Sequence, residues 1–504
     1  MTIEPTRDAV LDGLKAAKNQ IIFTRLVADL DTPVSLMLKL AGAGRMTFML
    51  ESVTGGEVRG RYSVIGMKPD VIWRCNGEVA EVNRQARITP DAFEKEADDP
   101  LTSLRALISN CHIDLPDGLP PIVAGVFGYM GYDMIRLVEK LPNQNPDTLK
   151  VPDAILFRPT VTVVLDGVKG EVIVAAPIWA SEGVTPEAAY AQAAERVMDA
   201  VADLDRVPAT ETLPANVQTD VGEAVSNTGK ARYMEMVETA RQYIHDGDIF
   251  QVVPSQRWAV PFELPPFSLY RALRRTNPSP YMFYFDYGDF QIVGASPEIL
   301  VRVKDDQVTI RPIAGTRPRG ANEAEDKALE ADLLSDEKEL AEHLMLLDLG
   351  RNDVGRVAKI GTVTPTEKFI IERYSHVMHI VSNVEGTLND EHDALSALLS
   401  GLPAGTVSGA PKVRAMEIID ELEVEKRGVY GGGVGYFSVT GEMDICIALR
   451  TGVVKDQTLY VQAGGGVVWD SDPEAEHEET VNKSKALMQA ARDAIRYVRL
   501  GRSQ

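Results

Sequence analysis

The segment from Lys338 to Asp353, KELAEHLMLLDLGRND, constrains the fold of this chain most strongly, because it combines an apolar helical stripe with two closely spaced glutamates. Four leucines recur at offsets that bury one side of a helix: Leu333, Leu340, Leu344 and Leu347. Glu339 and Glu342 then share an adjoining face of that helix. The pattern predicts a packed helix with both glutamates beside the packed side.

A second acidic pair with the same spacing lies near the C-terminus. Ser471 or Asp472 can cap a helix there, and Pro473 suits its first turn. Glu476 and Glu479 follow, again three residues apart. If the two helices converge, their carboxylates suit a hard divalent cation that keeps several waters and binds an anionic substrate. The pairs therefore predict a magnesium site, and the structural alternative is two solvated helix faces.

Length and composition indicate a globular protein. A chain of 504 residues can form two or three domains. Because the N-terminus lacks a basic start followed by an apolar core, and no apolar run is long enough to cross a bilayer, we expect a cytoplasmic location. Three isolated cysteines predict neither a disulfide framework nor a zinc site.

The charge balance limits the partners. With 52 basic and 74 acidic residues the net charge is -22, which disfavours nucleic acid and anionic membranes as partners. A site for a carboxylate substrate must therefore gain local positive charge from a few Arg or Lys residues, helix N-termini or a bound metal.

The chain divides into three parts by pattern. Residues 1–202 contain short strands and turns followed by an alanine-rich helix from about Pro186 to Val201. Residues 203–226 lack periodicity and predict a linker. Residues 227–504 open with an amphipathic helix ending near Gly247 and then alternate helices with strands.

Several motifs predict polar contacts to a ligand. Gly315 and Thr316 in RPIAGTRPRG combine close backbone approach with a hydroxyl donor. Thr406 precedes a helix with Pro411 among its early positions, where free amides suit a carboxylate and ordinary capping is the alternative. Arg450 ends the apolar strand DICIALR and has a planar fork suited to a carboxylate, with a rim salt bridge as the alternative.

Other positions are ambiguous by pattern alone. The glycine cluster 464–466 in VQAGGGVVWD allows close ligand approach, but no Lys-Ser/Thr pair follows it as in a phosphate loop. His379 shares a strand face with Val377 and Val381, which is typical of a structural histidine. Glu298 in GASPEIL precedes an apolar run, so that partial burial would raise its pKa and suit it to proton donation.

Seven motifs in order resemble the chorismate-utilising enzymes: RPIAGTRPRG, AEHLMLLDLGRND, RYSHVMH, AGTVSGAPKVRAMEIIDELE, YGGGVGYF, ICIALRTG and QAGGGVVWDSDPEAEHEET. Within that family the anthranilate synthase component I branch is most similar. The resemblance implies an α+β fold with antiparallel sheets packed face to face, helices outside and two lobes. It also implies a lyase that adds ammonia to chorismate and then eliminates pyruvate to give anthranilate.

The resemblance assigns roles residue by residue. Glu342 and Glu479 would hold Mg²⁺, with Glu339 and Glu476 bound through water or behind them. Glu298 would protonate the departing hydroxyl, and His379 and Thr406 resemble residues needed for pyruvate elimination. The residues that would position chorismate are Gly315, Thr316, Tyr430, Arg450, Gly464, Gly465 and Gly466.

Two positions distinguish this branch from its relatives. Isochorismate and salicylate synthases resemble this chain, but at the position that matches Gln251 they carry a lysine that activates water. Ala314 stands where aminodeoxychorismate synthases commonly carry a lysine that attacks the ring. Direct addition of ammonia fits best, and aminodeoxychorismate synthase component I is the alternative enzyme. Because no cysteine sits in a glycine-flanked nucleophile turn, the ammonia source implied is a separate glutamine amidotransferase subunit.

The first domain resembles a tryptophan-binding regulatory unit. By resemblance, L-tryptophan would bind as an inhibitor at Glu51, Ser52, Pro280, Tyr281 and Met282, with Glu51 meeting its amino group. The alternative from a different functional class is a catalytically silent regulatory protein that binds tryptophan.

Overall fold

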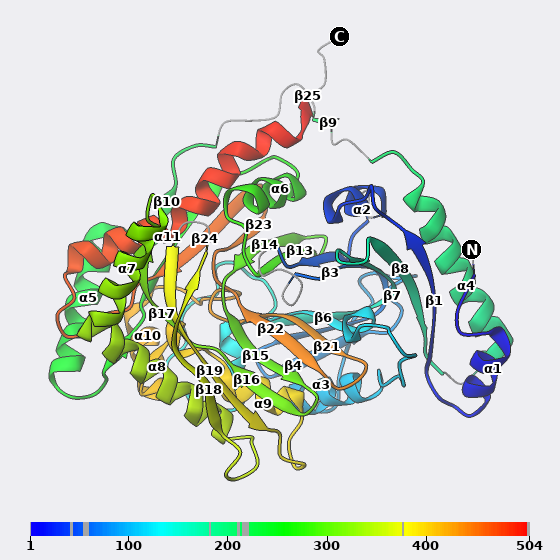
Figure 1. The fold of residues 1–504 in the computed structure, drawn as a ribbon, viewed down its shortest axis with the longest axis horizontal. Coiled ribbons are helices and arrows are strands. Elements are labelled where there is room, and N and C mark those ends of the chain that lie inside the picture. Colours follow the sequence, from blue (N-terminus) through cyan, green and yellow to red (C-terminus); the bar gives the residue numbers. More distant parts are fainter. Residues whose placement is uncertain are drawn as a thin grey trace.

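Antiparallel strands form the interior of the protein and helices lie outside them in the computed structural model (Figure 1). The structure describes residues 2–40, 44–53, 60–180, 183–208, 212–213, 221–374 and 377–500. The α-helices are α1 (Arg7–Lys15), α2 (Pro33–Leu40), α3 (Pro100–Ser109), α4 (Pro186–Leu204), α5 (Lys230–His245), α6 (Pro266–Thr276), α7 (Glu323–Ser335), α8 (Glu337–Gly355), α9 (Ala394–Gly401), α10 (Lys412–Leu422) and α11 (Pro473–Asp493). Short 3₁₀ turns are η1 (Pro121–Val123), η2 (Tyr132–Leu137), η3 (Gly405–Val407) and η4 (Ala494–Tyr497).

Along the sequence, helix α4 divides the strands into an earlier and a later group. Those before it are β1 (Gln20–Val27), β2 (Thr47–Glu51), β3 (Tyr62–Asn76), β4 (Val79–Asn83), β5 (Glu94–Lys95), β6 (Gly125–Met130), β7 (Ala154–Asp166) and β8 (Glu171–Ile178). Those after it are β9 (Thr212–Leu213), β10 (Val225–Ser226), β11 (Gln251–Val252), β12 (Ser255–Pro261), β13 (Tyr281–Asp286), β14 (Phe290–Ser296), β15 (Ile299–Lys304), β16 (Gln307–Ile310), β17 (Ile313–Pro318), β18 (Thr364–Arg373), β19 (Val377–Thr387), β20 (Gly409–Ala410), β21 (Gly433–Ser438), β22 (Met443–Ile447), β23 (Thr451–Lys455), β24 (Thr458–Gly464) and β25 (Arg499–Leu500).

The two halves of the chain share their sheets. Strand β2 pairs antiparallel with β13, which aligns Phe48 with Phe285, and β6 pairs antiparallel with β21, which aligns Phe127 with Tyr436. The Phe48 and Phe127 rings stack at 4.3 Å, so the two pairings meet in one aromatic interior. The predicted α+β class with facing antiparallel sheets is confirmed.

The division into 1–202, 203–226 and 227–504 stays a prediction. Helix α4 continues to Leu204, and β10 already pairs with β12 before residue 227. Residues 209–211 and 214–220 of the expected linker lie outside the described residues. Among the described residues, no helix is long and apolar enough to span a membrane.

The helix predicted around residues 338–353 is present as α8, but its buried face differs from the predicted one. Leu333 belongs to α7, because Asp336 ends that helix and caps α8 by accepting hydrogen bonds from the Lys338 and Glu339 amides. Leu344 is 55% exposed. The residues that α8 buries are His343, Leu346, Leu347, Gly350, Asp353 and Val354. Leu333 and Leu347 are buried and Leu340 is partly buried, as predicted, whereas Leu344 is exposed and Leu333 belongs to the preceding helix.

Candidate active site

The glycine loop at the end of β24 lies where several side chains approach the backbone closely. A Cβ on Gly464 would lie 2.8 Å from Pro254 O and 2.9 Å from the Tyr430 hydroxyl, and one on Gly465 would lie 3.0 Å from Glu476 Oε2. The contact of Gly464 with the Pro254 backbone is too short for a Cβ, so glycine is required at this position for steric reasons, whereas Gly465 faces the movable end of Glu476.

The second glutamate pair follows this loop on α11. Asp472 caps the helix through the Ala475 amide, and Pro473 occupies its first turn, as predicted. Glu476 is half-buried, and the pKa of its carboxyl is raised, first by burial and then by the charge of Glu479. Glu476 Oε2 is buried and, among the described residues, has no hydrogen-bond partner.

The first glutamate pair, on α8, reaches the same loop. Gln251 Nε2 donates to Glu342 Oε1 at 2.8 Å, and a Cβ on Gly466 would lie 2.8 Å from that Nε2 and 3.9 Å from that Oε1. Lys338 bonds Asp470 at 2.8 Å. This bond is the main cause of the raised pKa of Lys338, and the charges of Glu476 and Glu342 contribute less. The Gly464–Gly466 loop thus lies between the two acidic pairs.

The four glutamates fit a magnesium ion by chemistry. They supply oxygen donors, which a hard cation prefers. The pKa of Glu339 is raised by burial and then by the charge of Glu342, and a divalent cation would relieve this repulsion between carboxylates. Among the described residues no group of three or more His, Cys, Asp or Glu is already gathered at metal-binding distance. Arg317 instead contacts Glu339 at 3.2 Å. The magnesium site itself stays a prediction.

Lys483 is a site residue that the sequence interpretation missed. Its Nζ lies 2.7 Å from Glu479 Oε1 and donates to Gly464 O at 2.9 Å. A lysine four residues after Glu479 on one helix face was the available signal. Lys483 brings positive charge to a site that has a large acidic background.

The β17 bulge brings Thr316 to His379. Gly315 has φ +68°, which favours glycine, and the register shifts between Ala314 and Thr316. Nδ1 of His379 lies 3.1 Å from Gly315 O and 3.0 Å from Thr316 Oγ1. Burial lowers the pKa of His379, so its imidazole is neutral at neutral pH.

Glu298 is a buried acid. Burial raises its pKa to about 8, against opposing effects of Thr406, the Ile313 amide and the charge of Arg450. Thr406 Oγ1 lies 3.4 Å from Glu298 Oε1 and 3.3 Å from its Oε2. Both line a small cavity of about 20 Å³ that also reaches Asp353. A carboxyl with this pKa holds a proton at neutral pH and can donate it.

One predicted local structure is confirmed and one was wrong. Thr406 precedes α10 as predicted; it lies in η3, and β20 and the N-cap Pro411 stand between it and that helix. Arg450 does not end a strand; it lies between β22 and β23 with φ +48°. That conformation directs its charge toward Glu298 and His379, whose pKa values it lowers.

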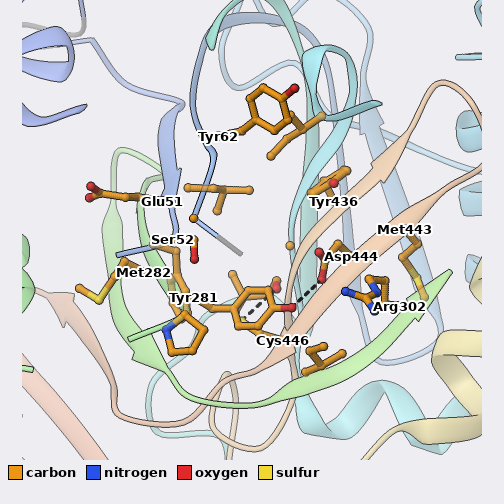
Figure 2. A pocket seen from close by; sticks show the side chains of 18 of the residues that line it. Glu51, Ser52, Tyr62, Tyr281, Met282, Arg302, Tyr436, Met443, Asp444 and Cys446 are labelled. Atoms are coloured by element: carbon orange, nitrogen blue, oxygen red, sulfur yellow. Dashed lines mark hydrogen bonds between the residues drawn. The ribbon is translucent and has the colours of Figure 1, made fainter. Parts of the chain in front are cut away.

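A further cavity lies apart from these groups. It has a volume of about 440 Å³, and all five residues expected to bind tryptophan line it: Glu51, Ser52, Pro280, Tyr281 and Met282. Tyr281 donates to Asp444 at 3.2 Å inside it (Figure 2). The cavity lies between segments from both halves of the chain.

The Glu51 carboxylate does not face this cavity. It accepts hydrogen bonds from Tyr270 at 2.7 Å and from Arg274 at 2.5 and 2.7 Å, both on α6, and it points away from Tyr281 in Figure 2. This carboxylate is therefore paired with α6, and its expected contact with the amino group of tryptophan stays a prediction. Asp444 also lines the cavity, and its carboxylate accepts the hydrogen bond from Tyr281 there.

Comparison with known proteins places the chain in a family. The chain is 70% identical over 487 residues to anthranilate synthase component 1 from Cereibacter sphaeroides, which covers 97% of each chain. It is 50% identical to the protein of that name from Pseudomonas putida, over 92% of this chain and 93% of that one.

Solved structures agree. The crystal structure of anthranilate synthase component I from Streptococcus pneumoniae matches with a TM-score of 0.75 at 39% identity, covering 86% of this chain and 94% of that chain. The menaquinone-specific isochorismate synthase from Escherichia coli shares the fold, with a TM-score of 0.70 at 20% identity over 96% of this chain and 98% of that one. The family model described as chorismate binding enzyme matches residues 60–489, and the chain belongs to this family of chorismate-binding enzymes.

Proposed function

We propose that this chain is the large subunit of anthranilate synthase. In this proposal it aminates chorismate with ammonia supplied by a separate glutaminase subunit and then eliminates pyruvate to give anthranilate. The observation that carries the proposal is the approach of a buried, protonated Glu298 to Thr406 and Arg450. The 70% identity to a protein named anthranilate synthase component 1 supports the same branch. The cytoplasmic location stays a prediction from the sequence.

The first step joins ammonia to ring carbon C2 while the C4 hydroxyl departs. Glu298 donates its proton to that hydroxyl, which leaves as water, and the new C2 ammonium gives up one proton. Arg450 and Lys483 supply the positive charge that two substrate carboxylates require. Magnesium, when bound, would hold the ring carboxylate and neutralise its charge. Glu342 and Glu479 would hold the ion, with Glu339 and Glu476 behind them.

The second step removes the C2 proton and breaks the bond between the ring and the enolpyruvyl oxygen, which gives anthranilate; the departing enolpyruvate takes up a proton at its methylene carbon and becomes pyruvate. His379 is suited to the proton transfer because it is neutral. Among the described residues, both hydrogen-bond contacts of its ring involve Nδ1, so Nε2 is the nitrogen that can exchange a proton with the substrate. Thr316 and Gly315 orient this ring.

Gln251 supports ammonia rather than activated water as the nucleophile. An amide side chain has no basic nitrogen, and its Nε2 already donates to Glu342. Ala314 likewise offers no amine to attack the ring, which disfavours the aminodeoxychorismate synthase alternative.

A direct assay tests the proposal. The purified chain with chorismate, magnesium and ammonium chloride is expected to form fluorescent anthranilate, most rapidly at alkaline pH, where more of the ammonium is free ammonia. Glutamine in place of ammonium should give no product. Strong glutamine-dependent activity of the single chain would contradict the separate glutaminase. Chorismate consumption with aminodeoxychorismate as the end product would favour the alternative enzyme, and tryptophan binding without turnover would favour the non-catalytic one.

We also propose that L-tryptophan inhibits through the 440 Å³ cavity. Apolar residues that line it, among them Pro280, Ile299 and Val434, suit an indole, and Asp444 suits the ammonium group. Inhibition requires that tryptophan bind more tightly to the arrangement of the chain that binds chorismate less well.

Ser52→Phe is expected to abolish inhibition by tryptophan while leaving kcat largely unchanged, because the ring would fill the cavity where Ser52 lines it. Inhibition curves for wild type and variant check this. Asp444→Asn should weaken inhibition more than Glu51→Gln does, since Asp444 lies in the cavity. Equal inhibition of wild type and Ser52→Phe would defeat the assignment.

A further inference from the structure

We infer that Arg427, held by Glu423, is a positioning residue that fixes three active-site segments relative to one another. The inference rests on the proposed function, because the segments it joins carry Gln251, Thr406 and Tyr430. The family resemblance assigned no role to Arg427 or to Glu423.

Arg427 is almost completely buried, at 2% exposed. Its Nη1 donates to Val407 O at 2.6 Å, and its Nη2 donates to Val253 O at 2.6 Å and to Glu423 Oε1 at 2.6 Å. Nε donates to both oxygens of Glu423, at 3.1 and 3.0 Å. All three guanidinium nitrogens are therefore bonded, and two of them reach main-chain carbonyls on different segments.

Both carbonyls belong to segments of the candidate active site. Val407 directly follows Thr406, whose hydroxyl contacts Glu298. Val253 follows the short strand β11, which begins with Gln251. The Val253 amide also donates to Ser408 O at 2.9 Å. One guanidinium thus ties the segment of Thr406, which contacts the proton donor Glu298, to the segment of Gln251, which bonds Glu342.

The third segment is held through an aromatic ring. The Arg427 guanidinium lies 5.5 Å from the ring centre of Tyr430 and 4.7 Å from that of Tyr132. Tyr430 is a predicted substrate residue, and its hydroxyl lies against the Gly464 backbone. The position of the Tyr430 ring therefore depends on the same cation.

Glu423 anchors the cation to the sheet. It accepts from the Ser255 amide at 2.7 Å and from the Ser255 hydroxyl at 2.8 Å, and Ser255 accepts in turn from Gln462. Ser255 opens β12, which pairs with β24 ahead of the glycine loop. Lysine would keep the charge but lacks a planar fork, so it would not hold Val253 O and Val407 O at once.

The test compares Arg427→Lys with Arg158→Lys. Arg158 is a partly buried arginine, with a side chain 13% exposed, that is bonded to Asp70 and stacked over Trp179 and contacts none of the site segments named above. Rates are expressed per folded protein, measured with ammonium and saturating magnesium. Arg427→Lys is expected to lose on the order of 10²-fold in kcat/KM for chorismate, the scale of a small misplacement of reacting groups. Arg158→Lys should lose thermal stability without losing kcat/KM.

A second comparison separates positioning from stability alone. Thr406→Val should reduce the rate less in the Arg427→Lys background than in wild type, because Thr406 is already misplaced there. Full multiplication of the two losses would overturn the inference, as would a wild-type kcat/KM in folded Arg427→Lys. If Arg427→Lys does not fold, Glu423→Gln takes its place, and the same coupling with Thr406→Val is expected.

Three signals are followed in every variant: anthranilate fluorescence, chorismate consumption and chorismate binding by calorimetry. A wild type that consumes or binds chorismate without forming anthranilate would refute the proposed function. The effect of Arg427→Lys, compared with that of Arg158→Lys, would then be measured as lost chorismate consumption or weakened chorismate binding. A failure of the proposed function can therefore be distinguished from a failure of the Arg427 inference.

Discussion

Glu298→Gln is expected to lower kcat for anthranilate formation by roughly 10²–10⁴-fold, the range that a positioned general acid contributes. The substitution keeps the shape of the side chain and its contact with Thr406 but removes the transferable proton. Chorismate binding should change much less, because Glu298 is buried mainly among apolar neighbours and acts on the departing hydroxyl. Steady-state kinetics with saturating ammonium and magnesium give kcat and KM separately.

The pH dependence provides a sharper criterion. Burial raises the pKa of Glu298 to about 8, and the protonated form is the active one. The rate of the wild type at constant free ammonia should therefore be full below this pH and fall as pH rises through about 8. Glu298→Gln should lack this fall. Asp70→Asn, which removes a carboxylate from the distant Arg158 pair, should keep the wild-type profile. A wild-type fall that persists in Glu298→Gln would assign the proton to another group.

Glu342→Gln and Glu479→Gln are each expected to reduce activity on the order of 10³-fold, since several kcal/mol of charge stabilisation by the metal depend on these carboxylates. The magnesium concentration for half-maximal activity should rise as well. Removal of magnesium with a chelator should stop turnover by the wild type, and added magnesium should restore it.

Neighbouring glutamates on the same helices provide matched controls. Glu337 on α8 is exposed, and Glu478 on α11 has a side chain that is 55% exposed. Glu337→Gln and Glu478→Gln make the same change in net charge without facing the glycine loop. They should keep wild-type activity and magnesium response. Chelator-resistant activity of the wild type, or equal losses in the controls and the site variants, would remove the basis for a magnesium site on these helices.

The sequence predicted the elements of this site better than their arrangement. Helix α11 begins where Asp472 and Pro473 predicted, because a cap and a first-turn proline act locally. The leucine spacing alone does not reveal that Asp336 ends one helix and starts another, so that Leu333 belongs to α7 and Leu344 is exposed. Arg450 lies between β22 and β23 with a positive φ, which the apolar pattern before it does not reveal.

The five residues that the resemblance assigns to tryptophan line one cavity, and the tryptophan site itself stays a prediction. On strand β2, the Glu51 carboxylate contacts Arg274, which is more than two hundred positions away in the sequence. Neither helix propensity nor residue spacing predicts this contact. The partner of a buried carboxylate is decided by packing, and packing is a property of the whole fold.

By itself the sequence determined which residues carry oxygen, nitrogen and proton-donating chemistry, which glycines leave the backbone open, and where the main helices start. These features depend on residue type and on neighbours a few positions away. Only the tertiary structure decided that Glu298 is buried beside Thr406, that Gly464–Gly466 lies between the two glutamate pairs, and that Arg427 joins three segments. Burial and approach between distant segments arise when strands pair and helices pack, and they change the pKa and position of groups whose local sequence is unchanged.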